Sequence, residues 1–574
     1  MFHTRRKQKE LVLISKLIQL ENQARQLRGS STLRATNVCR QLGTCSVKGT
    51  SRGFARDQKD KMRVTFLLVA LAAVALGKLA PLERPYKILM LLPVGSKSHK
   101  GFFTSVADAL GERGHKVVML SSYPASSKNA NVTEIDHGLK DMHHDNYNLF
   151  ESRDDPSGGL SVLSELIPVM VKRLYRIPEV KELYEKRKTF DLIIVDHMIN
   201  EMVYPFVHER TYMTISAFGM DACHSAVLGN VQNPAYVSGM LEEYPSPLSL
   251  KHRFLNLMQH ILMPFYLRHW SLVPKIQQEI SDIFPDLPPL LDIERNQSLT
   301  LINSHFSIDV ALPLLPSQVA VGAIHCRPAN PLPKNLEAWI SGAGPEGVVY
   351  FSLGTVVRGT TMPVVYRDMF VEAFKRLKQR VIWKYEEELE GVSDNVLIQK
   401  WLPQQDILGH PNVRLFISHG GLLSTQESLY HGTPVVALPV FADQPKNAMA
   451  IQKRGVGVAL VWEELSVDLI VNSIQEVMNN PKYNRNAEEV MSVVRDQPET
   501  PRERAVFWTE YVVRHQGAPR LRSPAAKLSW VEFLMLDVLL VLHVVAYVAF
   551  CVLSRVVRAV KGRLFPRRVK KKKD

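Results

Sequence analysis

A short segment in the second half of the chain combines a histidine, a glycine pair and a carboxylate in a pattern that could bind a phosphorylated ligand. Residues 416–432 read FISHGGLLSTQESLYHG, an apolar run that leads through His419 and two glycines into a helical pattern. Unpaired N–H groups and the dipole at a helix N-terminus favour an anion, and glycine lets the backbone approach it closely. His419 could donate to a phosphate oxygen, and Glu427 could accept from ribose hydroxyls. Alone, the pattern also fits an ordinary turn without a ligand.

Two further motifs flank this turn. The sequence WLPQ (401–404) precedes it, and FADQ (441–444) follows it. Together with FSLGT (351–355) and FDLIIVD (190–196), these motifs resemble the donor signature and neighbouring strands of the UDP-glycosyltransferase family. The resemblance covers most of residues 80–574. The segments SKSHK and LLSTQES and the KKKK tail are more similar to invertebrate members, which implies UDP-glucose as the donor.

The resemblance implies a UDP-sugar site built by nine residues, each with a chemically reasonable role. An aromatic face suits a base, a carboxylate suits vicinal hydroxyls, and backbone amides suit phosphate. The implied contacts are Trp401 and Gln404 with uracil, Glu427 with ribose, Ser352, His419, Gly421 and Ser424 with the diphosphate, and Asp443 and Gln444 with sugar hydroxyls. No cofactor is expected to stay bound, because the UDP-sugar is a co-substrate.

Transfer to an alcohol or phenol also needs a base, because a neutral hydroxyl is a poor nucleophile. Ser98-His99 follows the first predicted strand, where the family carries its catalytic histidine, and Asp196 ends the strand that carries its partner. The resemblance implies that His99 takes the acceptor proton and that Asp196 orients and stabilises the imidazolium. Without the resemblance, His99 in GSKSHK fits a solvated surface residue. Lys97 and Lys100 could lower the pKa of His99.

The chain has no Asp-x-Asp pair, which is the ligand motif of metal-dependent glycosyl transfer, so no metal is expected. One displacement at the anomeric carbon would invert its configuration and give a β-glycoside from an α-linked donor. Glucose and glucuronate donors share the Asp-Gln pair, so glucuronosyl transfer is an alternative. A second alternative is a non-catalytic UDP-sugar-binding or lipid-binding protein on the same fold, since fold alone does not imply activity. The presence of both His99 and Asp196 argues against it.

Placing these residues around one site requires two α/β halves. Unalternated apolar runs predict buried parallel strands at 86–93, 116–120, 190–196 and 212–217, and again at 347–355, 380–385, 413–421, 435–441 and 456–460. Helical patterns occupy 102–114, 363–378 and three stretches within 467–516. The sequence therefore predicts an α/β fold with two doubly wound, Rossmann-like domains facing a cleft, of GT-B type. Residues 78–326 would bind the acceptor, the proline-rich segment 327–346 would link, and 347–528 would bind the UDP-sugar.

The two ends of the chain predict a membrane protein. Residues 62–77 have the form of a cleaved secretory signal, so 1–61 are either an upstream extension or a basic leader, with a mitochondrial-type presequence as the rival. Residues 530–554 are apolar enough to span a bilayer, and the basic tail 555–574 ends in a dilysine pattern. We expect a single-pass protein of the endoplasmic reticulum membrane with a luminal body. The net charge of +15 comes from the tails, which argues against a nucleic-acid partner.

Other sequence features give weaker predictions about the luminal part of the chain. Asn131 and Asn296 begin glycosylation sequons, and Cys223 and Cys326 are the luminal cysteines, whose pairing the sequence leaves open. Residues 240–290 predict an amphipathic helical region, for which packing between domains is favoured over a lipid surface or an acceptor pocket. The acceptor is expected to be small and lipophilic, its identity is not readable, and a homo-oligomer is compatible with the sequence.

Overall fold

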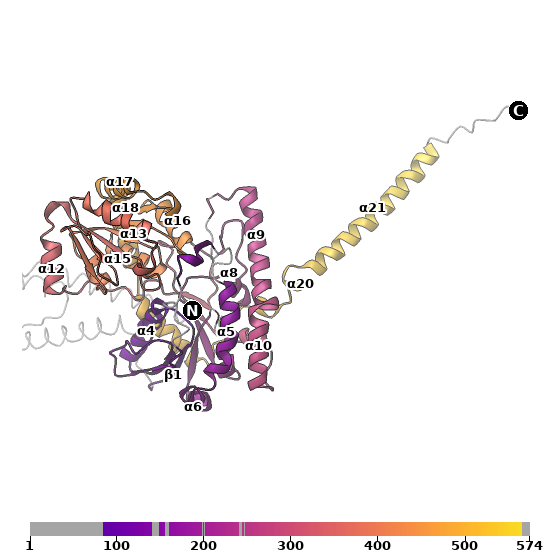
Figure 1. Cartoon of the computed structure of the whole chain (residues 1–574). Helices are drawn as coiled ribbons and strands as arrows, with labels where there is room; N and C mark the ends of the chain where they lie inside the picture. The colour runs from indigo at the N-terminus through magenta and orange to yellow at the C-terminus, as the bar shows by residue number, and fades with distance from the viewer. Residues whose placement is uncertain are drawn as a thin grey trace, which may run out of the picture. The chain divides into compact units, whose positions relative to one another are not determined.

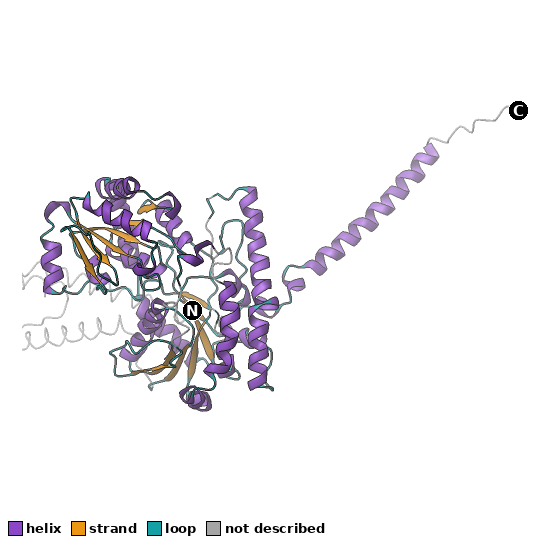
Figure 2. Ribbon diagram, viewed as in Figure 1, coloured by secondary structure: helices purple, strands orange, loops and turns teal. Residues whose placement is uncertain are grey.

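The computed structural model describes residues 84–139, 148–154, 160–197, 199, 201–239, 244–245 and 247–564. The predicted signal at 62–77, the segment before it and the dilysine pattern lie outside the described residues. Two parallel sheets carry the fold, each covered by helices (Figures 1 and 2). This confirms the prediction of two Rossmann-like α/β halves.

The first sheet has seven strands in the order β3-β2-β1-β4-β5-β6-β7. Its strands are β1 (Lys87–Leu92), β2 (Lys116–Ser121), β3 (Val132–Asp136), β4 (Leu192–Asp196), β5 (Tyr212–Ser216), β6 (Thr300–Ile302) and β7 (Gln318–Ala320). Every residue of β4 and β5 is buried, as expected for strands covered on both faces. The chain order reverses between β1 and β4, which is where a doubly wound sheet opens a crevice at the carboxyl ends of its strands.

Helices cover both faces of this sheet. They are α4 (Lys97–Glu112), α5 (Leu160–Leu174), α6 (Pro178–Lys186), α7 (Tyr204–Val207), α8 (Ala222–Val227), α9 (Leu250–Phe265), α10 (Leu272–Ile283) and α11 (Leu290–Glu294). The helix expected at 102–114 begins at Lys97, because Ser96 caps it: its hydroxyl accepts from the backbone N–H of His99 at 3.2 Å. His99 therefore lies in the first turn of a helix and not in a solvated loop.

The second sheet has six strands in the order β10-β9-β8-β11-β12-β13. They are β8 (Val348–Ser352), β9 (Arg380–Lys384), β10 (Val396–Gln399), β11 (Val413–Ser418), β12 (Val435–Ala437) and β13 (Gly457–Ala459). Its helices are α12 (Lys334–Ser341), α13 (Val364–Lys375), α14 (Gln404–Leu408), α15 (Leu422–His431), α16 (Gln444–Arg454), α17 (Val467–Asn479) and α18 (Pro481–Arg495). The proline-rich segment 327–346 holds α12, whose buried Leu336 and Ile340 pack with Val348 and Tyr350 of β8.

Helix α19 (Pro501–Arg514) follows the second sheet in sequence and contacts α4 and β7 of the first. Glu510 of α19 accepts from the Nε of Arg113 at 2.8 Å and lies 3.2 Å from the Nε2 of His115. Arg502 pairs with Glu112 at the end of α4. The chain thus returns to the first sheet after completing the second, and joins the two halves a second time.

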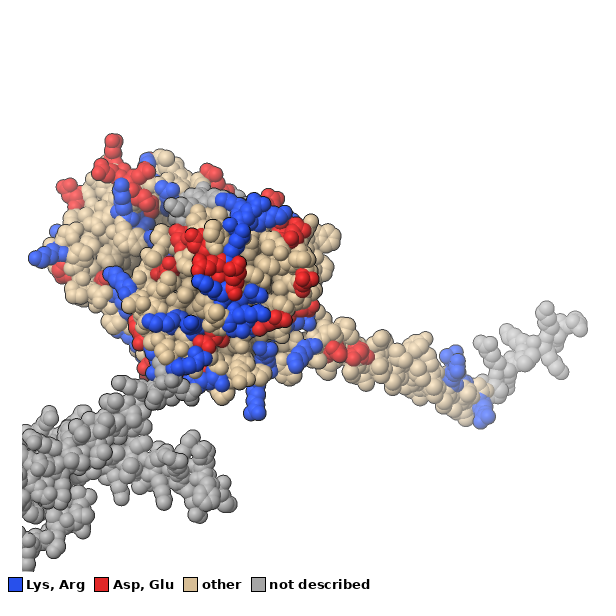
Figure 3. All heavy atoms as spheres, turned by 90° about the horizontal axis from the view of Figure 1, so that it is seen from below, with Lys and Arg blue, Asp and Glu red and all other residues tan. Residues whose placement is uncertain are grey.

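After α19 the chain forms α20 (Trp530–Phe533) and α21 (Leu536–Leu564). Helix α21 has 29 residues, is strongly apolar over most of its length and has no buried residues, so it is long and apolar enough to cross a membrane. Figure 3 shows most of its length free of charged side chains, while basic and acidic side chains intermix over the adjoining face of the body. Cys223 and Cys326 are free thiols.

Candidate active site

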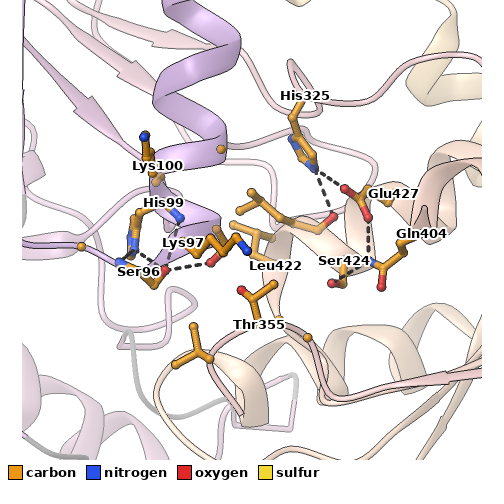
Figure 4. A pocket seen from close by; sticks show the side chains of 18 of the residues that line it. Ser96, Lys97, His99, Lys100, His325, Thr355, Gln404, Leu422, Ser424 and Glu427 are labelled. Carbon is orange, nitrogen blue, oxygen red and sulfur yellow. Dashed lines mark hydrogen bonds and ion pairs between the residues drawn. The ribbon is translucent and has the colours of Figure 1, made fainter. Parts of the chain in front are cut away.

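A cavity of about 940 Å³ lies between the carboxyl ends of the two sheets. Residues from both halves line it, and Figure 4 shows Ser96, Lys97 and His99 on one side, with His325, Gln404, Ser424 and Glu427 on the other. Every predicted site residue lines this cavity: His99, Asp196, Ser352, Trp401, Gln404, His419, Gly421, Ser424, Glu427, Asp443 and Gln444. The fold therefore brings together side chains that are up to 345 positions apart, from His99 to Gln444.

His99 is held by the cap of its own helix. Its side chain is only 7% exposed, and its Nδ1 lies 3.0 Å from the hydroxyl oxygen of Ser96 and 3.4 Å from the Ser96 backbone nitrogen. Phe218 packs edge-on against the imidazole, with ring centroids 3.9 Å apart. The Ser96 backbone N–H donates to Nδ1, the Ser96 hydroxyl can either donate to Nδ1 or accept from it, and the ring nitrogen that carries no proton can act as a base. Ser96 and Phe218 thus fix the ring in a cavity wall, and neither was predicted from the sequence.

Asp196 lies at the end of β4, where it is 2% exposed. Its Oδ1 lies 3.7 Å from the Nδ1 of His197, the next residue in the chain. Burial lowers the pKa of His197, but the neighbouring carboxylate of Asp196 outweighs it, so the net pKa of His197 is raised. Asp196 therefore stabilises positive charge on the imidazole of His197, which lies behind the cavity lining. The predicted pairing of Asp196 with His99 stays a prediction.

Lys100 does not project into the cavity as a free charge. Its side chain is 3% exposed and pairs with Glu134 of β3 at 2.6 Å, and its Nζ donates to the carbonyl of Tyr123 at 2.9 Å. A salt bridge this well enclosed neutralises the ammonium locally. The expectation that Lys100 acts on the pKa of His99 therefore loses its basis.

His419 follows β11 and fits between two glycines. A Cβ on Gly354 would lie 2.5 Å from Cε1 of His419, and a Cβ on Gly421 would lie 2.4 Å from its Nε2. Burial, with a smaller contribution from the charge of Lys384, lowers the pKa of His419 to about 4. Its Nδ1 has no hydrogen-bond partner among the described residues. A neutral, buried imidazole with an unsatisfied nitrogen is a group that can hydrogen-bond a ligand oxygen.

Helix α15 begins directly behind His419 with no side-chain cap. Gly421 is its N-cap, and no side chain accepts from its first N–H groups. Those donors and the helix dipole therefore face the cavity, as an anion site requires. Ser424, in the first turn, accepts from Nε2 of Gln404 at 3.0 Å.

Glu427 is one turn further along α15 and is the centre of a hydrogen-bond network. Its carboxylate accepts from Nε2 of Gln404 at 2.6 Å and from Nε2 of Gln405 at 3.2 Å. Burial raises the pKa of Glu427 to about 7, against the lowering effect of these two hydrogen bonds. The hydroxyl of Tyr350 donates to Oε1 of Gln404 at 3.2 Å, which fixes the amide orientation.

His325 is a member of this network that the sequence did not reveal. Its Nε2 donates to the carbonyl of Leu423 at 3.2 Å and lies 3.8 Å from Glu427. Burial lowers the pKa of His325 to about 4, so this imidazole is neutral and its Nδ1 has no partner among the described residues. The nearby Arg327 forms a two-point pair with Asp406 of α14. Arg327 begins the segment predicted as a linker, 327–346, and His325 lies two residues before it, in a stretch for which no strand or helix was predicted.

Asp443 and Gln444 lie where the loop after β12 enters α16. Ala442 has a positive φ of 56°, an uncommon conformation for a residue with a side chain, and it directly precedes this pair. Asp443 accepts from Asn447 at 2.7 Å, and burial raises its pKa. Oε1 of Gln444 accepts from the backbone N–H groups of Val440 and Phe441, which leaves its amide nitrogen as the group available to a ligand.

Trp401 is 61% exposed at the cavity, and the ammonium of Lys97 lies 4.3 Å from its ring centroid. This cation–π contact joins the first turn of α4 to the loop before α14 and crosses the cavity. One face of the indole is thus engaged by a residue of the first half. Among the described residues there is no cluster of three or more His, Cys, Asp and Glu side chains able to hold a metal ion.

Comparison with known proteins agrees with this geometry. Residues 89–572 match the family described as UDP-glucoronosyl and UDP-glucosyl transferase. The chain belongs to this family. The UDP-glycosyltransferase family resemblance is therefore confirmed, and the chain is a UDP-dependent hexosyltransferase.

Individual relatives are named for two different donor sugars, glucose and glucuronate. UDP-glucosyltransferase 2 of Dactylopius coccus is 32% identical over 85% of this chain and 95% of its own length. UDP-glucuronosyltransferase 2B19 of Macaca fascicularis is 32% identical over 67% of this chain and 74% of its own. A solved UDP-glucosyltransferase from Polygonum tinctorium has a TM-score of 0.51 at 16% identity, covering 75% of this chain and 99% of that one. This last match supports the GT-B fold of this UDP-glycosyltransferase.

Proposed function

We propose that this UDP-glycosyltransferase is a membrane-anchored, inverting enzyme that transfers glucose from UDP-glucose to a hydroxyl of small lipophilic acceptors. One observation supports the proposal above all others. The cavity holds a buried histidine and aspartate on the wall of the first sheet, and an uncapped helix N-terminus with a carboxylate network on the wall of the second. Acceptor activation and donor binding can therefore occur a short distance apart in one enclosed space.

The acceptor step uses His99 as the base. The acceptor oxygen attacks the anomeric carbon, the bond from that carbon to the β-phosphate oxygen breaks, and UDP leaves with the electron pair. The neutral imidazole of His99, hydrogen-bonded to Ser96, takes the hydroxyl proton. The carboxylate of Asp196 in the same cavity stabilises the imidazolium. Apolar side chains beside this wall, among them Val94, Ile199 and Phe218, suit a lipophilic acceptor.

The donor step uses the second sheet. Neutral His419 and the N–H groups that begin α15 hold the diphosphate, whose negative charge grows as UDP leaves. Trp401 stacks on uracil, Glu427 accepts from the ribose hydroxyls, and Asp443 and Gln444 bind the hexose. No metal takes part in these steps. The motifs similar to invertebrate members favour glucose over glucuronate.

We further propose that the anchor is α21, in the endoplasmic reticulum membrane, with the body on the luminal side. The basic tail after the helix and its dilysine pattern support this orientation. The lipophilic acceptors would then be drawn from, or released near, the bilayer.

The test is a transfer assay with membranes that contain the full chain, a simple phenol and equimolar UDP-glucose and UDP-glucuronate, with products identified by mass. We expect a hexose conjugate. A glucuronide product would show that the donor is UDP-glucuronate and would leave the proposed mechanism unchanged. Intact UDP binding with no product from either donor would support the non-catalytic alternative.

The catalytic assignment is tested by His99→Ala and Asp196→Asn. Because a positioned base contributes about 10²–10⁴-fold, His99→Ala should lower kcat within that range while the Kd of UDP changes little. His208→Ala is the matched control, since His208 belongs to the same half and does not line the cavity. Equal activity of the His99 and His208 variants would contradict the role of His99.

A further inference from the structure

Helix α9 presents an apolar stripe to the outside of the molecule. Leu250, Phe254, Leu257, Ile261 and Phe265 recur every three or four residues and are 76%, 60%, 40%, 52% and 55% exposed; we call these five residues the α9 face. This spacing places them on one side of a helix. Apolar patches of this kind mark an interaction site more often than a bare soluble surface.

The inward side of the same helix is polar. Asn256 is fully buried, its Nδ2 donates to the carbonyls of Pro234 and Val237 at 2.6 and 2.7 Å, and its Oδ1 accepts from the N–H of Gly239 at 3.1 Å. A helix of a soluble protein normally buries its apolar stripe and exposes its polar one. Helix α9 does the reverse, so the side that would be expected to pack between domains faces outward.

The surroundings of the α9 face match a bilayer surface. The apolar surface continues through Tyr266 and Trp270, and Trp270 is 75% exposed. Lys251 and Arg253 are exposed on the helix, and no Asp or Glu occurs between Tyr244 and Gln278. An apolar stripe with basic residues and an aromatic end is typical of helices that lie in the membrane interface.

The position of the α9 face relative to the anchor points to the same occupant. Gly229, directly after α8, abuts Ser523, Ala525 and Ala526, which lead into α20. Helix α8 in turn contacts α9. Trp530 and Val531 of α20 are themselves exposed apolar residues, and α9 lies at the edge of the body from which α20 and α21 leave (Figure 1). A bilayer crossed by α21 is therefore within reach of α9.

We propose that the α9 face, continued by Tyr266 and Trp270, lies in the interface of the bilayer that α21 crosses. The proposal rests on the membrane anchoring proposed above. It gives the acceptor-binding half a second attachment to the lipid from which a lipophilic acceptor would come. A second copy of the chain and the chain's own apolar segment at 62–77 are the other possible occupants, and the experiment distinguishes them.

The test places an environment-sensitive fluorophore at single cysteines in the full chain. The five native cysteines are replaced by alanine, and the variant is used if it keeps its transferase activity. Cysteine is then introduced by Phe254→Cys or Ile261→Cys, or Cys551 of α21 is restored. Val365→Cys on α13 is the matched control, because Val365 is an equally exposed apolar residue, 60%, in the other half. The labelled chains are reconstituted into phosphatidylcholine–phosphatidylserine vesicles with nitroxides at shallow or deep acyl positions.

We expect quenching at Phe254 and Ile261 to be several-fold stronger than at Val365, and stronger with the shallow nitroxide, since an interfacial helix lies about 5–10 Å into the headgroup boundary. Cys551 should be quenched by the deep nitroxide. Quenching at Cys551 with none at the α9 face would overturn this inference and keep the anchor, whereas no quenching at Cys551 would overturn the anchor. If a fluorophore on the α9 face is shielded from water but is not quenched by the lipid nitroxides, another occupant covers the face. That occupant is a second copy of the chain if the shielding depends on protein density. It is the chain's own segment if the shielding persists in detergent monomers.

Discussion

Ser96 connects the stability of a helix to the orientation of His99, the proposed base. Its hydroxyl accepts from the backbone of His99 and lies 3.0 Å from the imidazole Nδ1. Ser96→Ala should lower kcat, because the imidazole loses a hydrogen-bond partner that orients it, and should lower stability by about 1 kcal/mol through the lost cap. Ser96→Thr keeps the hydroxyl and should restore both. Steady-state kinetics and thermal melting separate the effects: a loss of stability without loss of kcat would restrict Ser96 to capping.

The proposed contact of Glu427 with the ribose predicts that donor binding depends on pH near neutrality. Its raised pKa of about 7 means that the carboxyl gains a proton as the pH falls from 8 to 6, and ribose hydroxyls donate best to the ionised form. The KM for UDP-glucose should therefore rise up to about tenfold over that range. His325 and His419 stay neutral there, since each has a pKa of about 4.

The control for this pH effect is Glu427→Gln. The amide cannot ionise, so its KM should be higher at pH 8 and nearly independent of pH. A wild-type KM that stays constant between pH 6 and 8 would show that Glu427 does not meet the donor as a carboxylate.

At the scale of elements, the turn from β11 into α15 can pass close to the imidazole of His419 because no Cβ fills the space around that ring. A Cβ on Gly421 would approach Nε2 of His419 to 2.4 Å, which forces the ring or the helix start to move. Gly421→Ala should weaken UDP binding by at least about tenfold, or about 1.4 kcal/mol. Isothermal titration with UDP measures it.

Gly101 of α4 provides the matched control for this prediction. It lines the same cavity, but a Cβ there would meet nothing within 4 Å. Gly101→Ala should leave the Kd of UDP unchanged and stabilise α4 by about 0.5–1 kcal/mol. If both variants bound UDP with the Kd of the wild type, the close approach of Gly421 to His419 would not contribute to UDP binding.

At the scale of the whole molecule, Glu510 of α19 connects the second half to the first half, at the end of α4. This carboxylate is 4% exposed and pairs with Arg113, His115 and Arg514. Nδ1 of His115 accepts from the backbone of Tyr86, so its Nε2–H needs Glu510 as acceptor. Glu510→Ala should therefore lower the unfolding free energy by about 3 kcal/mol.

Thermal melting of the solubilised chain tests this contact, with Glu112→Ala as control. Glu112 also joins α4 to α19, through Arg502, but its side chain is 64% exposed, so its loss should cost under about 1 kcal/mol. Equal melting temperatures for the two variants would contradict a fastening role of the buried Glu510.

Much of this enzyme could be predicted from local sequence. The buried strand β4 is an apolar run that ends at Asp196, and β11 is mostly apolar and is followed by His419, because strand burial and glycine turns are encoded by neighbouring residues. The boundary of α4 was missed by five residues, since Ser96 as a cap is recognisable only with its hydrogen bond. Short strands such as β6 and β7, of three residues each, carry too little pattern to be recognised.

Only the tertiary structure decided how distant residues act on one another. It brought His325 and Arg327 to the hydrogen-bond network of Glu427 and Gln405, paired Lys100 with Glu134, set Lys97 on Trp401 and returned α19 to α4. It also turned α9 so that its apolar side faces outward, where the sequence had favoured packing between domains. The spacing of apolar residues along a helix is set by the local sequence, so it predicts that one side of the helix is apolar. Which side meets the protein depends on partners far away in the chain, here the carbonyls that bind Asn256.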